Sequence, residues 1–136
     1  SLMKLLMKKH IMHVIIAGCR TFNDYDFVET EVLKIIGRFI GDEERKIQII
    51  SGEAKGVDQL AKKFAEKHGL EFIPIPADWK SKGRAAGPKR NEEMAKLAGT
   101  LIAFWDGKSK GTKSMIDYAN KYCHAHYVIR IDQIGK

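Results

Sequence analysis

The segment HVIIAG, residues 13–18, decides how the rest of this 136-residue chain is interpreted. It is short, apolar and rich in β-branched residues, which is typical of a strand buried on both faces of a parallel sheet. Other runs along the chain have the same character, and most of them also end at a glycine, a proline or a polar pair. These further predicted strands cover residues 47–50, 71–75, 100–105 and 126–131.

The segments between these strands carry apolar residues at helical spacing, so each predicts a helix that packs on the sheet. The first helix is expected to begin at Asn23 or Asp24 and to end at Gly41, and the last to begin at a Thr112 cap. The stripes expected to face the core are Val28, Val32, Ile35, Ile36 and Phe39; Val57, Leu60, Ala61, Phe64 and Ala65; Met94, Leu97 and Ala98; and Met115, Ile116, Ala119 and Cys123.

This alternation, with right-handed crossovers, predicts an α/β fold: a single Rossmann-like, doubly wound parallel sheet of five strands with helices on both faces. The expected strand order is 3-2-1-4-5, with the third strand at an edge because Pro74 lies inside it. In such sheets, ligands bind beyond the carboxyl ends of the strands, where the order reverses. That point lies between strands one and four, so loops 18–24 and 106–112, flanked by 51–58, are expected to form the site.

Length and composition fit one globular domain over residues 11–136. Residues 1–10 are set aside as a cloning remnant, Ser1-Leu2, followed by an N-terminal extension. No apolar run approaches the about 18 residues of a membrane span, and the pattern of a signal peptide is missing. The two cysteines have no metal-ligand spacing, so we expect a cytoplasmic protein with no metal site and no membrane partner.

The formal charge of +7 is concentrated in two short stretches that also carry glycine and other small residues. Without these charged residues, the chain has as many acids as bases. Glycine lets a backbone approach a ligand closely, and cations supply a favourable field, so the combination suits a ligand that bears phosphate. The alternative is a pair of solvated loops whose lysines aid solubility. The charged residues are Lys80, Lys82, Arg84, Lys89 and Arg90 in one stretch, and Asp106, Lys108, Lys110 and Lys113 in the other.

The loops after the first two strands offer different chemistry. The first lacks the GxGxxG dinucleotide pattern, but its Arg20 could pair with a phosphate or carboxylate, or with a neighbouring acid. In the second, Gly52 and Gly56 precede a helix and make an anion cradle plausible. Glu53 could accept a ribose hydroxyl or a base N–H, whereas Asp58 could equally compensate the helix dipole.

The loop after the fourth strand resembles a P-loop but has one residue too few between its glycines, and Thr112 stands where the lysine should follow. It could still present backbone N–H groups and the Thr112 hydroxyl to a phosphate. The long connection 77–87 is typical of a lid or binding loop. Its Trp79, like Trp105, could stack on a base or could belong to the core.

Five motifs in this chain resemble, in the same order, those of the YspA-like branch of the SLOG superfamily. This Rossmann-like group is named after the DNA-processing Smf/DprA proteins and the Lonely Guy enzymes. The chain departs from the pattern at Glu53, where glycine is usual, and at Gly99, where an acid is common. The motifs are GCRTFND (18–24), SGEAKGVDQLA (51–61), PADW (76–79), AAGPKRNEEM (85–94) and AFWDGKSKGT (103–112).

The resemblance implies a nucleotide or nucleotide-derived ligand, such as a mononucleotide, ADP-ribose or an NAD-like molecule, with the protein as its sensor or processor. No other cofactor is established. Relatives are often found in bacterial and phage conflict systems, and they are commonly dimers, so a homodimer is expected. The candidate ligand-binding residues are Gly18, Arg20, Ser51, Gly52, Glu53, Gly56, Asp58, Trp79, Arg84, Gly87, Arg90, Asn91, Gly107, Ser109, Gly111 and Thr112.

Two other functions remain open. Lonely Guy enzymes cleave the N-glycosidic bond of nucleoside monophosphates with an arginine, matched here by Arg90, and a glutamate, replaced here by Met115. Hydrolysis would therefore need Glu53, Asp58, Asp78 or Asp106 to take the place of that glutamate. The candidate catalytic residues are Arg90, Glu53 and Asp58. The other alternative, less expected than a small ligand, is single-stranded nucleic acid bound by the lysines and Trp79.

Overall fold

The computed structural model describes residues 10–52 and 54–135, and its centre is a five-stranded sheet in which neighbouring strands pair in parallel. The strand order β3-β2-β1-β4-β5 confirms the predicted α/β fold and the order 3-2-1-4-5. Pro74 ends β3 at the edge of the sheet, where its missing N–H is tolerated. The strands are β1 (His10–Gly18), β2 (Arg45–Ser51), β3 (Glu71–Pro74), β4 (Thr100–Trp105) and β5 (Ala125–Arg130).

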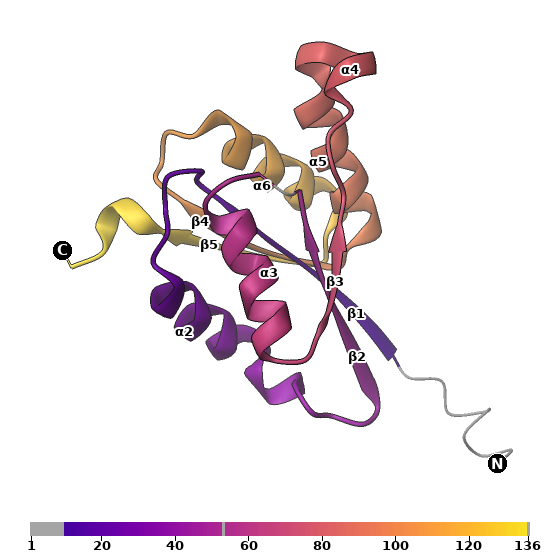
Figure 1. The fold of residues 1–136 in the computed structure, drawn as a ribbon, viewed down its shortest axis with the longest axis vertical. Coiled ribbons are helices and arrows are strands. Elements are labelled where there is room, and N and C mark those ends of the chain that lie inside the picture. The colour runs from indigo at the N-terminus through magenta and orange to yellow at the C-terminus, as the bar shows by residue number, and fades with distance from the viewer. Residues whose placement is uncertain (1–9, 53, 136) are drawn as a thin grey trace, which may run out of the picture.

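Helices α2 and α3 cover one face of the sheet, and α5 and α6 cover the other (Figure 1). The sequence of β1 explains this, because successive side chains of a strand point to opposite faces. Val14 and Ile16 pack under α2 and α3, whereas Ile15 and Ala17 pack under α5 and α6. The helices are α2 (Tyr25–Ile36), α3 (Val57–Lys67), α4 (Trp79–Lys82), α5 (Ala86–Leu97) and α6 (Lys110–Tyr122), with 3₁₀ turns η1 (Gly37–Phe39), η2 (Gly83–Ala85) and η3 (Ile131–Gln133).

Several helix ends differ from the prediction. Asp24 caps α2 as one of the two expected residues, but the α-helix stops at Ile36 and tightens into η1 before Gly41. The predicted Thr112 cap of α6 was wrong, since Ser109 is the cap and accepts from the Thr112 N–H at 3.5 Å. Asp106 accepts from the backbone N–H groups of Lys108 and Ser109 in the loop before α6. These bonds hold the loop so that the Ser109 hydroxyl, three residues before Thr112, faces the start of the helix.

The connection 77–87, expected to be a loop, is largely helical. It forms α4 and η2, and α4 protrudes at the top of the molecule (Figure 1). The Asp78 carboxylate caps α4 by accepting from the Ser81 N–H at 3.2 Å. No helix within the described ranges is long and apolar enough to span a membrane.

Candidate functional site

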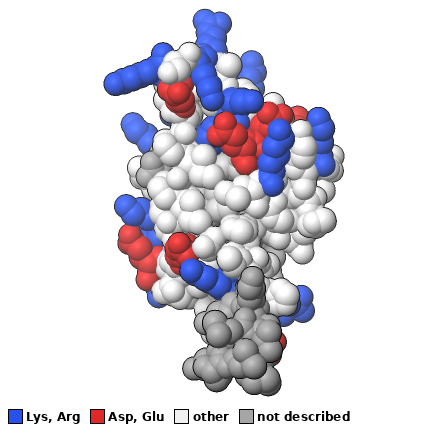
Figure 2. Space-filling view, turned by 90° about the vertical axis from the view of Figure 1, so that its right-hand side faces the viewer, with Lys and Arg blue, Asp and Glu red and all other residues white. Residues whose placement is uncertain are grey.

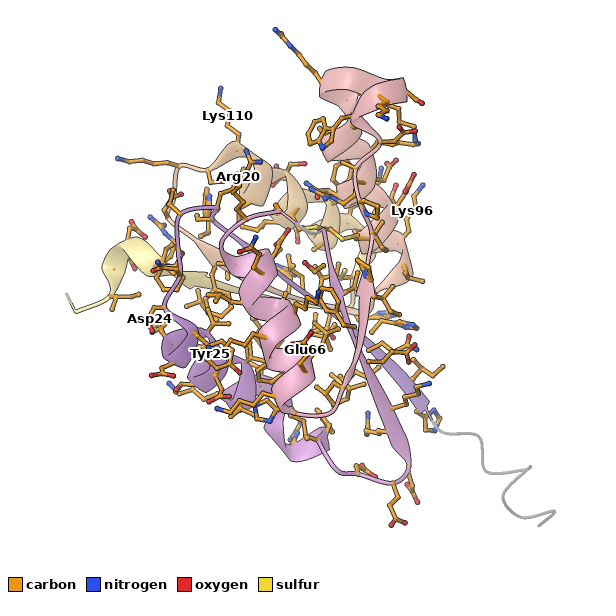
Figure 3. All side chains as sticks on the ribbon, in the orientation of Figure 1. Arg20, Asp24, Tyr25, Glu66, Lys96 and Lys110 are labelled. Atoms are coloured by element: carbon orange, nitrogen blue, oxygen red, sulfur yellow. The ribbon has the colours of Figure 1, made fainter. Side chains whose placement is uncertain are left out.

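A pocket of about 390 Å³ lies at the carboxyl ends of β1 and β4, where the sheet order reverses. Its walls come from the loop after β1, the start of α3, the α4–α5 segment and the first turns of α6. Figure 3 shows Arg20 and Lys110 at this same end of the molecule, with the Lys110 side chain extending outward. The pocket is thus where the topology rule led us to expect a site.

Most of the predicted ligand-binding residues line this pocket, although they come from distant parts of the sequence. The parallel sheet brings them together, because the carboxyl ends of its strands share one edge. Of the predicted residues, those lining the pocket are Gly18, Arg20, Asp58, Trp79, Gly87, Arg90, Asn91, Ser109, Gly111 and Thr112.

Other predicted residues lie behind the pocket wall and position what faces the ligand space. The Ser51 hydroxyl donates to the main-chain oxygen of Asp58 at 3.3 Å. Gly56 has φ +73°, and a side chain there would meet the carbonyl oxygens of Cys19 and Arg20. Gly107 has φ +81°, and a side chain there would meet the Arg130 guanidinium. Glycine is therefore required at both positions by backbone shape and close packing.

Three remaining candidates need separate comment. Gly52 does not line the pocket; its carbonyl accepts from Arg90 Nη1 at 2.6 Å, and the guanidinium occupies the space a Gly52 side chain would need. Arg84 is exposed on η2 and is absent from the pocket lining. Glu53 lies outside the described residues.

Arg90 is fixed in a network that crosses the pocket. Besides its bond to Gly52, its Nε donates to Asn91 Oδ1 at 3.1 Å. Asn91 is only 6% exposed, and its Nδ2 donates to the Gly111 carbonyl and to Ser114 Oγ, both at 3.3 Å. The network therefore links the loop after β2, helix α5 and the start of α6, and it holds the guanidinium in one orientation.

The start of α6 is only partly available to a ligand. Asp106 Oδ1 accepts from the N–H groups of Lys108 at 2.8 Å and Ser109 at 2.7 Å, and these bonds hold the pKa of that carboxyl below its usual range. The first four N–H groups of a helix lack intrahelical partners. Two of them, on Ser109 and Thr112, are taken by Asp106 and by Ser109 Oγ. The N–H groups of Lys110 and Gly111 have no such partner among the described residues, and both residues line the pocket.

Asp58 is the acidic side chain in the lining that the structure describes. It sits in the first turn of α3, is 7% exposed, and accepts from the Ala54 N–H at 3.0 Å. Burial raises the pKa of Asp58 to about 6, while the Ala54 hydrogen bond and the charges of Arg90 and Arg20 oppose the shift. A carboxyl that titrates near neutral pH inside a pocket is suited to exchanging a proton.

Only some of the basic residues that are concentrated in two stretches of the sequence line the pocket. Arg20, Arg90 and Lys110 are the cations that line it. The lysines and arginine of residues 80–89 are exposed, and Figure 2 shows basic side chains at the top of the molecule, around α4, with acidic ones among those below. Some are in weak ion pairs: Lys82 Nζ with Glu93 at 3.9 Å, and Lys89 Nζ with Glu92 at 3.6 Å.

The two tryptophans have different surroundings. Trp79 is 59% exposed and lines the pocket, and its ring lies 3.4 Å from where a Gly87 side chain would begin. Trp105 donates from Nε1 to the Ser109 carbonyl at 3.0 Å, and the Arg130 guanidinium lies over its ring at 5.3 Å. Trp79 is thus available to stack on a ligand, whereas Trp105 supports the loop before α6.

Sequence reasoning missed part of the lining. Met94 was assigned only to the core, whereas Met115 was assigned to the core and also matched to the Lonely Guy glutamate. Both are buried and also form pocket wall, because the helical stripe runs on to the ligand end. Lys110 belonged to a recognised basic stretch, but nothing in the sequence separated it from its neighbours. The other missed residues are Ala17, Ala54, Pro88 and Ser114. Within the described ranges, no group of three His, Cys, Asp or Glu side chains is arranged to hold a metal ion.

Comparisons with known proteins agree with this architecture. The sequence model of the YspA, cpYpsA-related SLOG family matches residues 12–81, about half of the chain. No curated protein matches the chain significantly. Among solved structures, the DNA processing protein A (DprA) of Streptococcus pneumoniae matches with a TM-score of 0.66 and 19% identity. The match covers 97% of this chain and 54% of that one, so this chain spans about half the length of the solved relative.

Proposed function

The chain belongs to the YspA, cpYpsA-related SLOG family, and on that basis we propose that its pocket binds a nucleotide or nucleotide-derived ligand, as a sensor or processor. One observation carries the proposal. Arg20, Arg90 and the start of α6 meet in a single pocket, and the exposed Trp79 lines the same pocket. This arrangement offers cationic donors for a phosphate and an aromatic face for a base.

The phosphate is assigned to the end formed by Arg20, Lys110 and the α6 N-terminus. The N–H groups of Lys110 and Gly111 add to the field of the helix dipole, which favours an anion. Arg90 can contribute as well. A guanidinium carries five N–H donors, and among the described residues Arg90 makes two donations, to Gly52 and Asn91.

The size of the pocket supports a small member of this ligand class. Its volume of about 390 Å³ lies near the lower end of the roughly 300–1,000 Å³ typical of ligand sites. A nucleoside monophosphate is the ligand we expect to fit inside. ADP-ribose or an NAD-like molecule would have to extend past Trp79 into solvent.

Thermal unfolding with a panel of nucleotides tests the proposal. The panel comprises AMP, GMP, CMP, UMP, ADP-ribose and NAD, with the corresponding nucleosides as controls for the phosphate. A ligand present at 100 times its dissociation constant stabilises a protein by about 2.7 kcal/mol. We expect at least one nucleotide, and none of the nucleosides, to stabilise the protein. The proposal fails if no nucleotide does, or if nucleosides do so equally.

Hydrolysis of an N-glycosidic bond is a second candidate, and Asp58 is the observation that favours it. Met115 lines the pocket at the position of the Lonely Guy glutamate and supplies no carboxylate. Asp58 is a buried carboxylate in the same lining, with a pKa of about 6. The test is release of free base from nucleoside monophosphates by the wild type and by Asp58→Asn. Release that disappears in the variant would support an enzyme.

Single-stranded nucleic acid is a further candidate, favoured by the exposed Trp79 next to the basic side chains of α4. Binding to a positively charged surface weakens strongly with salt, whereas stacking alone does so less. Oligonucleotide affinity at several salt concentrations, compared with AMP affinity, therefore separates this candidate from small-ligand binding. The expected homodimer is a proposal as well, and light scattering during size-exclusion chromatography would test it.

A further inference from the structure

Asp58 and Arg90 line the same pocket, but each forms its hydrogen bonds with other groups. Within the described part of the chain, no ion pair joins Arg90 to Asp58, and Arg90 donates to Gly52 and Asn91. Asp58 accepts from the Ala54 N–H. The two charges interact through space, and Arg20 acts on Asp58 in the same way. The Ala54 hydrogen bond and the field of the two arginines therefore favour the ionised carboxylate and oppose the larger effect of burial.

The charged groups facing Asp58 come from each side of the pocket. Arg90 belongs to α5 and Arg20 to the loop after β1, and both charges act on the Asp58 carboxyl. Lys110 lines the pocket from α6, with its side chain extending outward (Figure 3). The α6 N-terminus adds a partial positive charge. All of these favour an ionised carboxylate. They are also the groups on which an incoming phosphate would act.

We propose that Asp58 takes up a proton when an anionic group binds at Arg20 and Arg90, so that ligand and proton bind together. This inference rests on the proposed nucleotide function, and it assigns that function a dependence on pH. The proton comes from solvent and stays on the carboxyl group. No bond of the ligand is formed or broken.

The physical argument has two steps. In the free pocket, burial is opposed by the Ala54 hydrogen bond and by the two arginines, and the resulting pKa of about 6 leaves Asp58 mostly ionised at pH 7. A bound phosphate neutralises the arginines and adds a like charge beside the carboxylate, and both effects favour the protonated form. The protonated carboxyl then becomes an O–H donor toward the ligand, where the ionised form could only accept.

Calorimetry measures the proton directly. AMP binding is titrated at pH 7 in two buffers of different ionisation enthalpy, which gives the number of protons taken up per AMP. The phosphate of AMP itself titrates near pH 6, so the informative quantity is the difference between the wild type and Asp58→Asn. Asparagine keeps an acceptor for the Ala54 N–H but cannot take a proton. We expect the wild type to take up roughly 0.5–1 proton more than the variant.

Asp78→Asn is the matched control, because Asp78 caps α4 and does not line the pocket. It should take up as many protons as the wild type. Inorganic sulfate, whose charge is constant between pH 6 and 8, is the second probe. Its affinity for the wild type should fall by up to about tenfold per pH unit above the Asp58 pKa, and its affinity for Asp58→Asn should stay nearly constant.

A third measurement uses the wild type alone, in case Asp58→Asn folds poorly. Carboxyl ¹³C shifts followed against pH should show the Asp58 midpoint moving upward when sulfate is added. If AMP binds with equal proton uptake in the wild type and Asp58→Asn, or if the midpoint does not move, this inference is wrong and the nucleotide proposal stands. If neither sulfate nor any nucleotide of the panel binds the wild type, both are wrong.

Discussion

The guanidinium of Arg90 donates to the carbonyl of Gly52 at 2.6 Å and fills the space that a side chain on Gly52 would occupy. The glycine after β2 thus acts indirectly, by letting an arginine from α5 cross the back of the pocket. The same guanidinium is oriented by Asn91, which in turn binds the start of α6. The site depends on this chain of contacts as much as on the residues that would touch a ligand.

Gly52→Ala should therefore weaken nucleotide binding although residue 52 does not line the pocket. The added methyl group displaces the guanidinium, and the Gly52 bond to Arg90 is lost or distorted. Charge-assisted hydrogen bonds contribute about 1.5–3 kcal/mol, so we expect a loss of affinity of roughly tenfold or more, measured by calorimetry. Arg90→Lys should weaken binding similarly, because lysine lacks the planar fork of donors. The control is Arg84→Lys, which lies outside the pocket lining and should bind as the wild type does.

Gly111→Val should abolish nucleotide-dependent thermal stabilisation while leaving the fold intact. The space where its side chain would begin is open, and Gly111 lines the pocket at the start of α6. A valine there would occupy the position proposed for the phosphate. Gly99 also faces open space but lies before β4, away from the pocket, so Gly99→Val is the control that should keep its response. If nucleotides stabilise Gly111→Val as much as the wild type, the phosphate does not bind at the start of α6.

Met115→Glu should raise any trace hydrolysis of nucleoside monophosphates, because it restores a carboxylate to the pocket wall beside Arg90 and the α6 loop. A positioned acid or base typically contributes on the order of a hundred- to ten-thousand-fold. Met115 is 1% exposed, so the buried glutamate should also lower the melting temperature. Met115→Gln has a similar shape without the acid and should show no gain in base release. Equal rates in the two variants would exclude this carboxylate as a catalyst.

Asp58→Asn should stabilise the free protein at pH 8 but not at pH 3.5. Burial raises the pKa of Asp58 to about 6 in the folded state, from about 3.9 in an unfolded chain. Between these values the folded state binds more protons, so the free energy of unfolding falls as pH rises from about 4 to about 6. Asparagine does not titrate, so the variant does not lose this stability. Its free energy of unfolding at pH 8 should exceed that of the wild type by on the order of 1–3 kcal/mol. Urea unfolding at both pH values measures it; a destabilised variant at pH 8 would mean that the arginines outweigh burial.

The sequence predicted the fold well because the fold depends on patterns that extend over whole elements. The apolar run around Ile15 and Ile16 could only be a strand covered on both faces, and Pro74 identified the edge. The location of the pocket followed from topology. Local hydrogen bonding could not be read in the same way. Nothing in the sequence indicated that Asp106 would occupy the N–H groups of Lys108 and Ser109, which the loop pattern offered to a phosphate.

The direction of individual side chains was the second feature that could not be predicted from the sequence. Arg84 and Arg90 lie in one basic stretch, yet Arg90 enters the pocket and Arg84 stays exposed on η2. The difference arises because the stretch is helical, so residues six apart need not share a surface. From the sequence, Asp58 was interpreted as a residue that could compensate the helix dipole. Its burial beside two arginines depends on where the fold positions α3, α5 and the loop after β1, which the sequence did not indicate.

Because the two tryptophans have different environments, the intrinsic fluorescence of this protein should report on ligand binding. Trp105 is fixed by the Ser109 carbonyl and shielded by Arg130, so its emission should respond little to events at the pocket. Trp79 stands largely in solvent where a base would arrive, and stacking would quench or shift its fluorescence. Occupancy of the pocket can thus be followed without any label, with the signal arising from a single indole.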